Sequence, residues 1–75
     1  MIYHLYSQRR KEYLLATGAF LDGDGANGYT HWTPYIDRAQ GFGSRKAAKN
    51  IQRLLMEKRE NTVIVNEKGV AVWDS

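Results

Sequence analysis

The fold is decided by one stretch of the chain, Trp32-Thr-Pro-Tyr-Ile-Asp-Arg-Ala-Gln-Gly-Phe-Gly-Ser-Arg-Lys-Ala-Ala48. Its beginning predicts a strand that lies at a sheet edge or ends near Pro34, because proline cannot donate to a ladder of hydrogen bonds. The glycines on either side of Phe42 allow a tight turn, and we expect Phe42 to pack over the start of the following helix. Ser44 is the expected N-cap, since its hydroxyl can accept a bond from a free N–H of the first turn.

The helix predicted after Ser44 runs from residue 45 to about residue 59 and is strongly amphipathic. At 100° per residue, its apolar side chains fall inside one arc of about 100°, and these are Ala47, Ala48, Ile51, Leu54 and Leu55. The opposite side holds polar residues and one methionine, namely Arg45, Lys46, Lys49, Gln52, Arg53, Met56 and Glu57. The pattern predicts a helix that lies on a core with a basic outer face.

Strands are predicted on both sides of this helix, over residues 2–7, 12–20, 29–36, 62–65 and 70–73. Residues 8–11 and 66–69 are the expected turns, residues 21–28 a glycine-rich loop, and Gly18 a bulge or close backbone approach. In the third strand, alternation places Trp32 and Ile36 on one face and residues 29, 31, 33 and 35 on the other. One helix on an antiparallel sheet of about five strands is the economical packing of this order, so residues 1–75 are expected to form a single α+β domain.

Composition narrows the classes of function. Seventy-five residues bury only about 60% of their unfolded surface, and a typical ligand pocket of roughly 300 Å³ or more would consume much of so thin a core. The size therefore favours a surface that binds a macromolecule over an enzyme. The absence of cysteine excludes a disulfide or thiolate metal site. No signal-peptide pattern or apolar run of about 18 residues is present, so we expect a cytoplasmic protein with no membrane segment.

Three patterns suggest a specific chemistry and do not hold. The segment Gly41-Phe42-Gly43 matches three positions of the RNA-recognition motif, but a helix begins where that motif needs an aromatic strand. Residues 22–28 suggest a calcium loop, yet the required residue types are missing at its fifth, sixth and twelfth positions. His4 and His31 lack a spacing that places two metal ligands on one face. We therefore expect no catalytic residue, metal or cofactor.

Two basic clusters are the best candidates for binding. One is Arg9-Arg10-Lys11 at the tip of the first hairpin, and the other consists of Arg45, Lys46, Lys49 and Arg53 on the helix. Together they could make roughly five to seven phosphate contacts, with a log–log salt slope of about −5. Nearby Glu12, Glu57 and Glu60 weaken a phosphate-tracking groove, and a solvated polar face is the plainest alternative. Met56 on the same face favours a protein interface.

An aromatic stripe forms a third candidate site. Tyr29, His31 and Tyr35 alternate along the predicted third strand, where they could stack bases or anchor a partner. The same residues could equally form the second face of a thin sheet.

A resemblance extends over residues 13 to 55. It rests on an Ala-x-x-Phe-x-Ser-x-x-x-Ala turn leading into a helix, with residues Tyr13, Leu14, Gly18, Phe20, Trp32, Ala39, Phe42, Ser44 and Ala48. In this arrangement the chain resembles small accessory proteins of bacteriophages and other mobile elements. The resemblance implies an accessory role, and some proteins of this kind are anti-CRISPR or other anti-defence inhibitors. It carries no catalytic residues.

The leading hypothesis is therefore a non-enzymatic module that binds a host protein or nucleoprotein complex and inhibits it. Direct binding of DNA or RNA phosphates through the helix and the hairpin tip is the alternative, and a metal- or cofactor-dependent enzyme is the third. Whether two copies of the chain associate is left open by the sequence.

Overall fold

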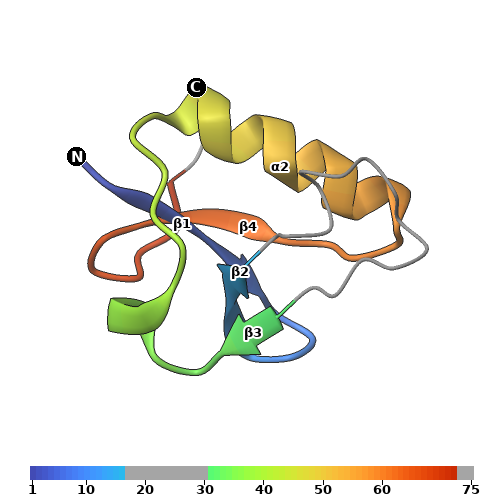
Figure 1. Ribbon diagram of the computed structural model, residues 1–75, viewed down its shortest axis with the longest axis horizontal. Coiled ribbons are helices and arrows are strands. Elements are labelled where there is room, and N and C mark those ends of the chain that lie inside the picture. The colour runs from blue at the N-terminus through green and yellow to red at the C-terminus, as the bar shows by residue number, and fades with distance from the viewer. Residues whose placement is uncertain (17–30, 73–75) are drawn as a thin grey trace.

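A computed structural model describes residues 1–16 and 31–72. In these residues an antiparallel sheet of four strands carries one α-helix, which confirms the α+β class (Figure 1). The elements are β1 (Tyr3–Ser7), β2 (Glu12–Ala16), β3 (His31–Thr33), the 3₁₀ helix η2 (Ile36–Arg38), α2 (Arg45–Glu57) and β4 (Val63–Asn66). The predicted bulge at Gly18, the loop over residues 21–28 and the strand positions of Phe20 and Tyr29 lie outside the described residues.

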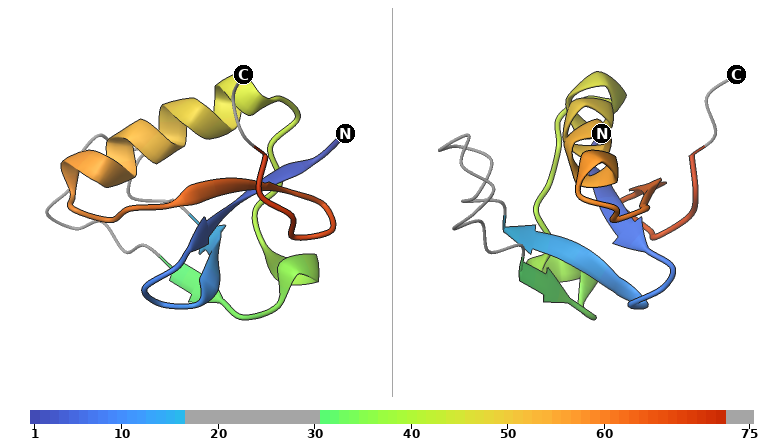
Figure 2. Two further views of the ribbon diagram at one scale, coloured as in Figure 1. Left: turned by 180° about the vertical axis from the view of Figure 1, so that it is seen from behind. Right: turned by 90° about the vertical axis from the view of Figure 1, so that its right-hand side faces the viewer.

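The strand order is β3-β2-β1-β4, so the first strand lies inside the sheet and pairs with strands from both ends of the chain. Antiparallel pairing places Tyr6 opposite Tyr13 on β2, and Tyr3 opposite Asn66 on β4. Between β3 and β4, at opposite edges, the chain crosses one face of the sheet through α2 (Figure 2). The connection from one edge to the other explains why the helix covers the sheet.

The prediction of about five strands is wrong among the described residues, because the segment after β4 does not form a further strand there. It pairs with β4 only locally: Asn66 N–H donates to Val70 O at 2.8 Å, and Val72 N–H donates to Ile64 O at 2.8 Å. The turn predicted over residues 66–69 is confirmed, with Asn66 Oδ1 accepting bonds from Lys68 and Val70 N–H. Gly69 closes this turn with a φ of +81°.

The third strand is an edge strand and ends at Thr33, directly before Pro34, as the missing N–H of proline predicts. The strand is shorter than predicted, so its alternation does not reach Ile36. Trp32 packs against the core, whereas Ile36 begins η2, and its Cδ1 lies 3.6 Å from the position of a Cβ on Gly69. The prediction that Trp32 and Ile36 share one strand face is therefore wrong.

The segment before the helix is inserted between the diverging ends of β1 and β2. Phe42 exchanges two backbone hydrogen bonds with Tyr3, of 2.8 and 2.9 Å, while Gln40 N–H donates to Leu14 O at 2.8 Å. This pairing holds Phe42 at 6% exposure in the core, below the start of α2. The segment thus acts as a short piece of sheet that leads the chain into the helix.

The core lies between α2 and one face of the sheet. Leu5 on β1, Leu14 on β2 and Leu55 on α2 are fully buried, and Ala48 and Phe42 complete the cluster. Trp32 and Ile64 pack against it from the two edge strands. The expected apolar arc of the helix is confirmed except at Leu54, which is 39% exposed at the margin of the arc.

The helix begins as predicted, with Ser44 Oγ accepting a 3.2 Å bond from Ala47 N–H. It ends at Glu57, two positions earlier than expected, because Arg59 turns into the left-handed region with a φ of 64°. Glu60 N–H then donates to Leu55 O at 2.8 Å and Arg59 N–H to Met56 O at 2.9 Å. These two bonds form a Schellman motif, in which glycine is the usual residue at the position of Arg59.

Replacing Arg59 by glycine is expected to raise the free energy of unfolding by about 1 kcal/mol, because glycine enters the left-handed region without a Cβ clash. Urea unfolding measures the change. Lys58, which has a φ of −96°, supplies the matched control. Lys58→Gly should lower stability, since it adds backbone freedom to the unfolded chain at a position whose φ is already negative. Equal changes in the free energy of unfolding of the two variants would contradict the left-handed conformation of Arg59.

Candidate partner-binding surface

The outer surface of α2 combines basic and apolar side chains, and we define it as Arg45, Lys46, Lys49, Arg53 and Met56. All five residues are exposed, and Met56 keeps 57% of its surface accessible. Leu54 is 39% exposed, but it lies at the margin of the apolar arc and does not belong to this surface. The packing of the opposite face onto the sheet fixes the direction of this surface, so its charges are presented from one rigid element.

One residue predicted on this surface has a different role. Gln52 is half-buried, and its Nε2 donates a 2.7 Å hydrogen bond to the backbone carbonyl of Thr62, just before β4. The bond holds α2 to the chain that enters the edge strand. A helical wheel gives no sign of this contact, because the acceptor belongs to a segment that the wheel does not contain.

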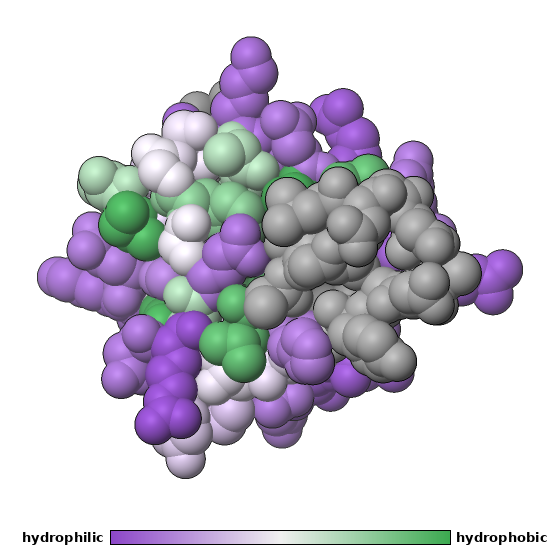
Figure 3. All heavy atoms as spheres, viewed as in Figure 1, coloured by the Kyte–Doolittle hydropathy of each residue, from purple (hydrophilic) through white to green (hydrophobic). Residues whose placement is uncertain are grey.

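A cleft of about 180 Å³ lies between α2 and the β4 edge of the sheet. Its lining is apolar on the sheet side and polar on the helix side, and consists of Arg45, Lys49, Gln52, Val63, Ile64, Ala71 and Val72. Figure 3 shows the molecule in the orientation of Figure 1. On its left half, green apolar side chains lie among purple hydrophilic ones. The sequence gives no signal of the cleft, because it depends on how far the helix stands from the edge strand.

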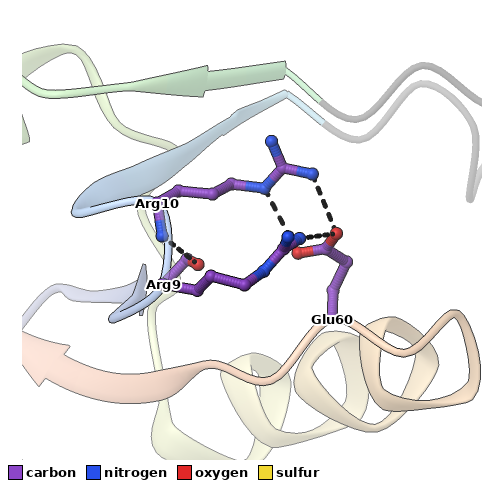
Figure 4. A network of polar contacts seen from close by, with 4 residues as sticks. Arg9, Arg10 and Glu60 are labelled. Carbon is purple, nitrogen blue, oxygen red and sulfur yellow. Dashed lines mark hydrogen bonds and ion pairs between the residues drawn. The ribbon is translucent and has the colours of Figure 1, made fainter.

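The first hairpin tip is tied to the chain that follows α2. Glu60 Oε1 accepts bonds of 2.8 Å from both Arg9 and Arg10, and its Oε2 accepts a 3.2 Å bond from Arg10 Nε (Figure 4). The Arg10 guanidinium also lies over the ring of Trp32, 5.1 Å from its centroid. Arg10 is therefore held between an aromatic ring and a carboxylate, and it connects β3 to the chain that follows α2.

The contacts change the charge balance of the tip. The hydrogen bond from Arg10 lowers the pKa of Glu60, and the same bond raises the pKa of Arg10. The Glu60 side chain is only 16% exposed, whereas those of Arg9 and Arg10 are 72% and 38% exposed. One of the two arginine charges is thus compensated within the protein, which leaves less positive charge for a partner than the sequence alone implies.

Glu60→Gln is expected to lower the free energy of unfolding by about 1 kcal/mol at neutral pH, because it removes the charge that holds both arginines. Since Arg10 lowers the folded-state pKa of Glu60, this stabilisation exists above the unfolded pKa of about 4.3. It is lost as the pH falls through the lower folded value. Chemical unfolding measured from pH 7 to pH 3 should therefore show the free energies of unfolding of the parent protein and of Glu60→Gln becoming equal at low pH.

Glu57→Gln is the matched control for this experiment, because Glu57 is an exposed carboxylate at the end of the same helix. Its effect should stay within about 0.5 kcal/mol. A parallel loss in both variants would show that the effect is one of net charge, and that the two arginines do not depend on Glu60.

The predicted binding residues fall into separate places. Lys11 is exposed with a φ of 57° at the end of the hairpin turn. The arginines of this turn bond to Glu60, which follows the C-terminal end of α2. Arg45 and Lys46 lie at the N-terminal end of the same helix. Thirteen helical residues span about 20 Å. A single partner must therefore extend along the whole helix to contact both basic clusters.

The aromatic stripe is not continuous in the described residues. Tyr29 lies outside them, His31 is exposed on β3, and Thr33 between His31 and Tyr35 is buried. Tyr35 is 59% exposed beyond the end of the strand, with the Arg38 guanidinium 5.6 Å from its ring centroid. His31 and Tyr35 therefore belong to different elements of structure, and no common face for them follows from the strand.

In the part of the chain that the structure describes, no group of three or more histidine and acidic side chains is placed to hold a metal ion. The helix described here is also too short and too polar to cross a membrane. Comparison of the chain with protein-family models, curated proteins and solved structures finds no match.

Proposed function

We propose that the protein is a non-enzymatic binding module that docks the outer surface of α2 onto an acidic surface of a protein partner. The carrying observation is the 57% exposure of Met56 among the cations on one face of the helix. A purely electrostatic surface gains nothing from exposed apolar side chains, whereas methionine and arginine are enriched at protein interfaces. The basic residues supply the charge complementarity that orients the partner.

The tie between the hairpin tip and Glu60 supports a protein partner over a nucleic acid. Because Glu60 compensates one of the two arginine charges at the tip, the four basic residues of α2 are the larger source of phosphate contacts. Four such contacts give a log–log salt slope of only about −4. Direct binding of DNA or RNA remains the second candidate, favoured by the four basic residues within three turns of one helix.

The concrete form of the proposal is inhibition of a host nucleoprotein complex, the role that the resemblance to phage accessory proteins implies. In such a complex, the surface of α2 would meet acidic protein or occupy a site that normally holds nucleic acid. Both modes of inhibition need only binding, so no catalytic group is required.

The double charge reversal Lys49→Glu with Arg53→Glu is expected to reduce partner capture at least about tenfold, because attraction to an acidic surface becomes repulsion. The tagged protein is used to capture partners from lysate, with and without nuclease, and mass spectrometry quantifies them. Circular dichroism should show unchanged folding, since both side chains are exposed.

The matched control is Arg38→Glu with Lys68→Glu, which makes the same change in net charge at two exposed residues outside α2 and outside both basic clusters. Capture should survive in this variant. Loss of capture in both variants would point to net charge alone and overturn the helix assignment. Capture that disappears with nuclease would favour the nucleic-acid candidate.

A further inference from the structure

The cleft beside α2 has a size that selects among ligands. At about 180 Å³ it is smaller than the roughly 300 to 1,000 Å³ of pockets that enclose a drug-sized molecule. It suits a single large side chain, and interface hot spots are commonly single anchors that fill such a pocket. Its sheet side is formed by Val63, Ile64, Ala71 and Val72, so the anchor must be apolar.

The backbone around the cleft restricts how a partner can enter. The outer edge of β4 already bonds to the segment that follows it, through Asn66 to Val70 and Val72 to Ile64. Addition of a partner strand at this position would have to break those bonds. A partner therefore enters the cleft with a side chain and keeps its own backbone outside.

The rim of the cleft carries two cationic side chains. Arg45 and Lys49 are one turn apart on α2, a spacing that puts both on the same side of the helix. Carboxylates that flank an apolar anchor would meet this rim when the anchor occupies the sheet side. The cleft is thus complementary to an aliphatic residue between acidic neighbours.

We infer that the cleft receives one aliphatic side chain of the protein partner, from a segment whose neighbouring residues are Asp or Glu. The inference rests on the proposed function, because the cleft shares Arg45 and Lys49 with the outer surface of α2. It adds a specificity element to that surface: charge brings the acidic partner to the helix, and the anchor selects the segment that binds.

The test uses two blocked pentapeptides of equal charge, Asp-Glu-Leu-Glu-Asp and Asp-Glu-Ser-Glu-Asp, titrated into the full chain by NMR. The leucine peptide should bind at least about tenfold more tightly, as expected for a buried anchor. It should shift the amides of Val63, Ile64, Ala71 and Val72. Equal affinity, with shifts confined to the outer surface of α2, would overturn the inference and leave the proposed function standing.

Two further measurements test whether the leucine side chain occupies the cleft. Ala71→Phe fills the cleft and should abolish the preference for leucine, whereas Val70→Phe changes a neighbour that is 59% exposed and does not line the cleft. Hexanoate, an apolar chain with one carboxylate, is the third probe. Cleft binding of hexanoate as tight as that of the leucine peptide would replace the peptide anchor by a small amphipathic anion. If neither peptide binds, the acidic segment is excluded, and the capture experiment decides the proposed function separately.

Discussion

Leu55→Ala is expected to lower the free energy of unfolding by about 3 kcal/mol, the largest effect of any variant considered. Leu55 is fully buried at the centre of the cluster formed by Leu5, Leu14, Phe42 and Ala48. Removing its branched end costs the transfer of those atoms and leaves a cavity that the sheet cannot collapse to fill. A domain of this size has a total stability of only about 4 to 11 kcal/mol.

The measurement is thermal or urea unfolding, and a loss of about 3 kcal/mol corresponds to a fall in Tm of roughly 12 to 24 °C. Leu54→Ala is the matched control, with the same side chain one position earlier and 39% of its surface exposed. Its cost should stay below about 1 kcal/mol. Similar losses at Leu54 and Leu55 would contradict the packing of α2 described above.

Gly69→Ala is expected to have the second largest effect, a loss of about 2 kcal/mol. The backbone of Gly69 has a φ of +81°, where a Cβ is strained. That Cβ would also lie 3.1 Å from Tyr13 Oη, which would have to yield, and 3.6 Å from Ile36 Cδ1, an ordinary van der Waals distance. Most of the loss is therefore expected from the strained backbone at Gly69, with a smaller part from the displaced Tyr13 hydroxyl.

Gly43→Ala is the matched control, because a Cβ at Gly43 meets no atom within 4 Å and its φ lies outside the left-handed region. This variant should be neutral or stabilising by up to about 1 kcal/mol, since alanine restricts the unfolded chain. Urea unfolding of the two variants separates a steric requirement for glycine from a general effect of adding a methyl group.

Local signals predicted those parts of the fold that depend on neighbouring residues. The N-cap at Ser44, the end of β3 before Pro34 and the burial of Ala48 follow from hydrogen-bonding capacity and helical periodicity. The end of α2 was predicted two positions late, because nothing in the type of Arg59 indicates a left-handed conformation. The predicted strand after Gly69 appears only as a short pairing with β4 in the described residues.

The candidate site was less predictable, because its properties depend on residues distant in the sequence. Arg10 looks like a free cation at a hairpin tip, yet Glu60 and Trp32 reach it from two other elements. From the sequence, Glu60 was recognised only as an acidic residue close to the helix. Gln52 looks like a surface residue until the carbonyl of Thr62 is placed beside it.

The position of β1 inside the sheet has a consequence for synthesis on the ribosome. Of the described strands, β1 is synthesised first and β4 last, yet the two are neighbours in the sheet. Until β4 emerges, β1 can pair with β2 but lacks its second neighbour in the sheet. Folding must then bring Tyr3 beside Asn66, and a contact so distant in the sequence slows folding. The sheet therefore reaches its full pairing only after β4 has been synthesised.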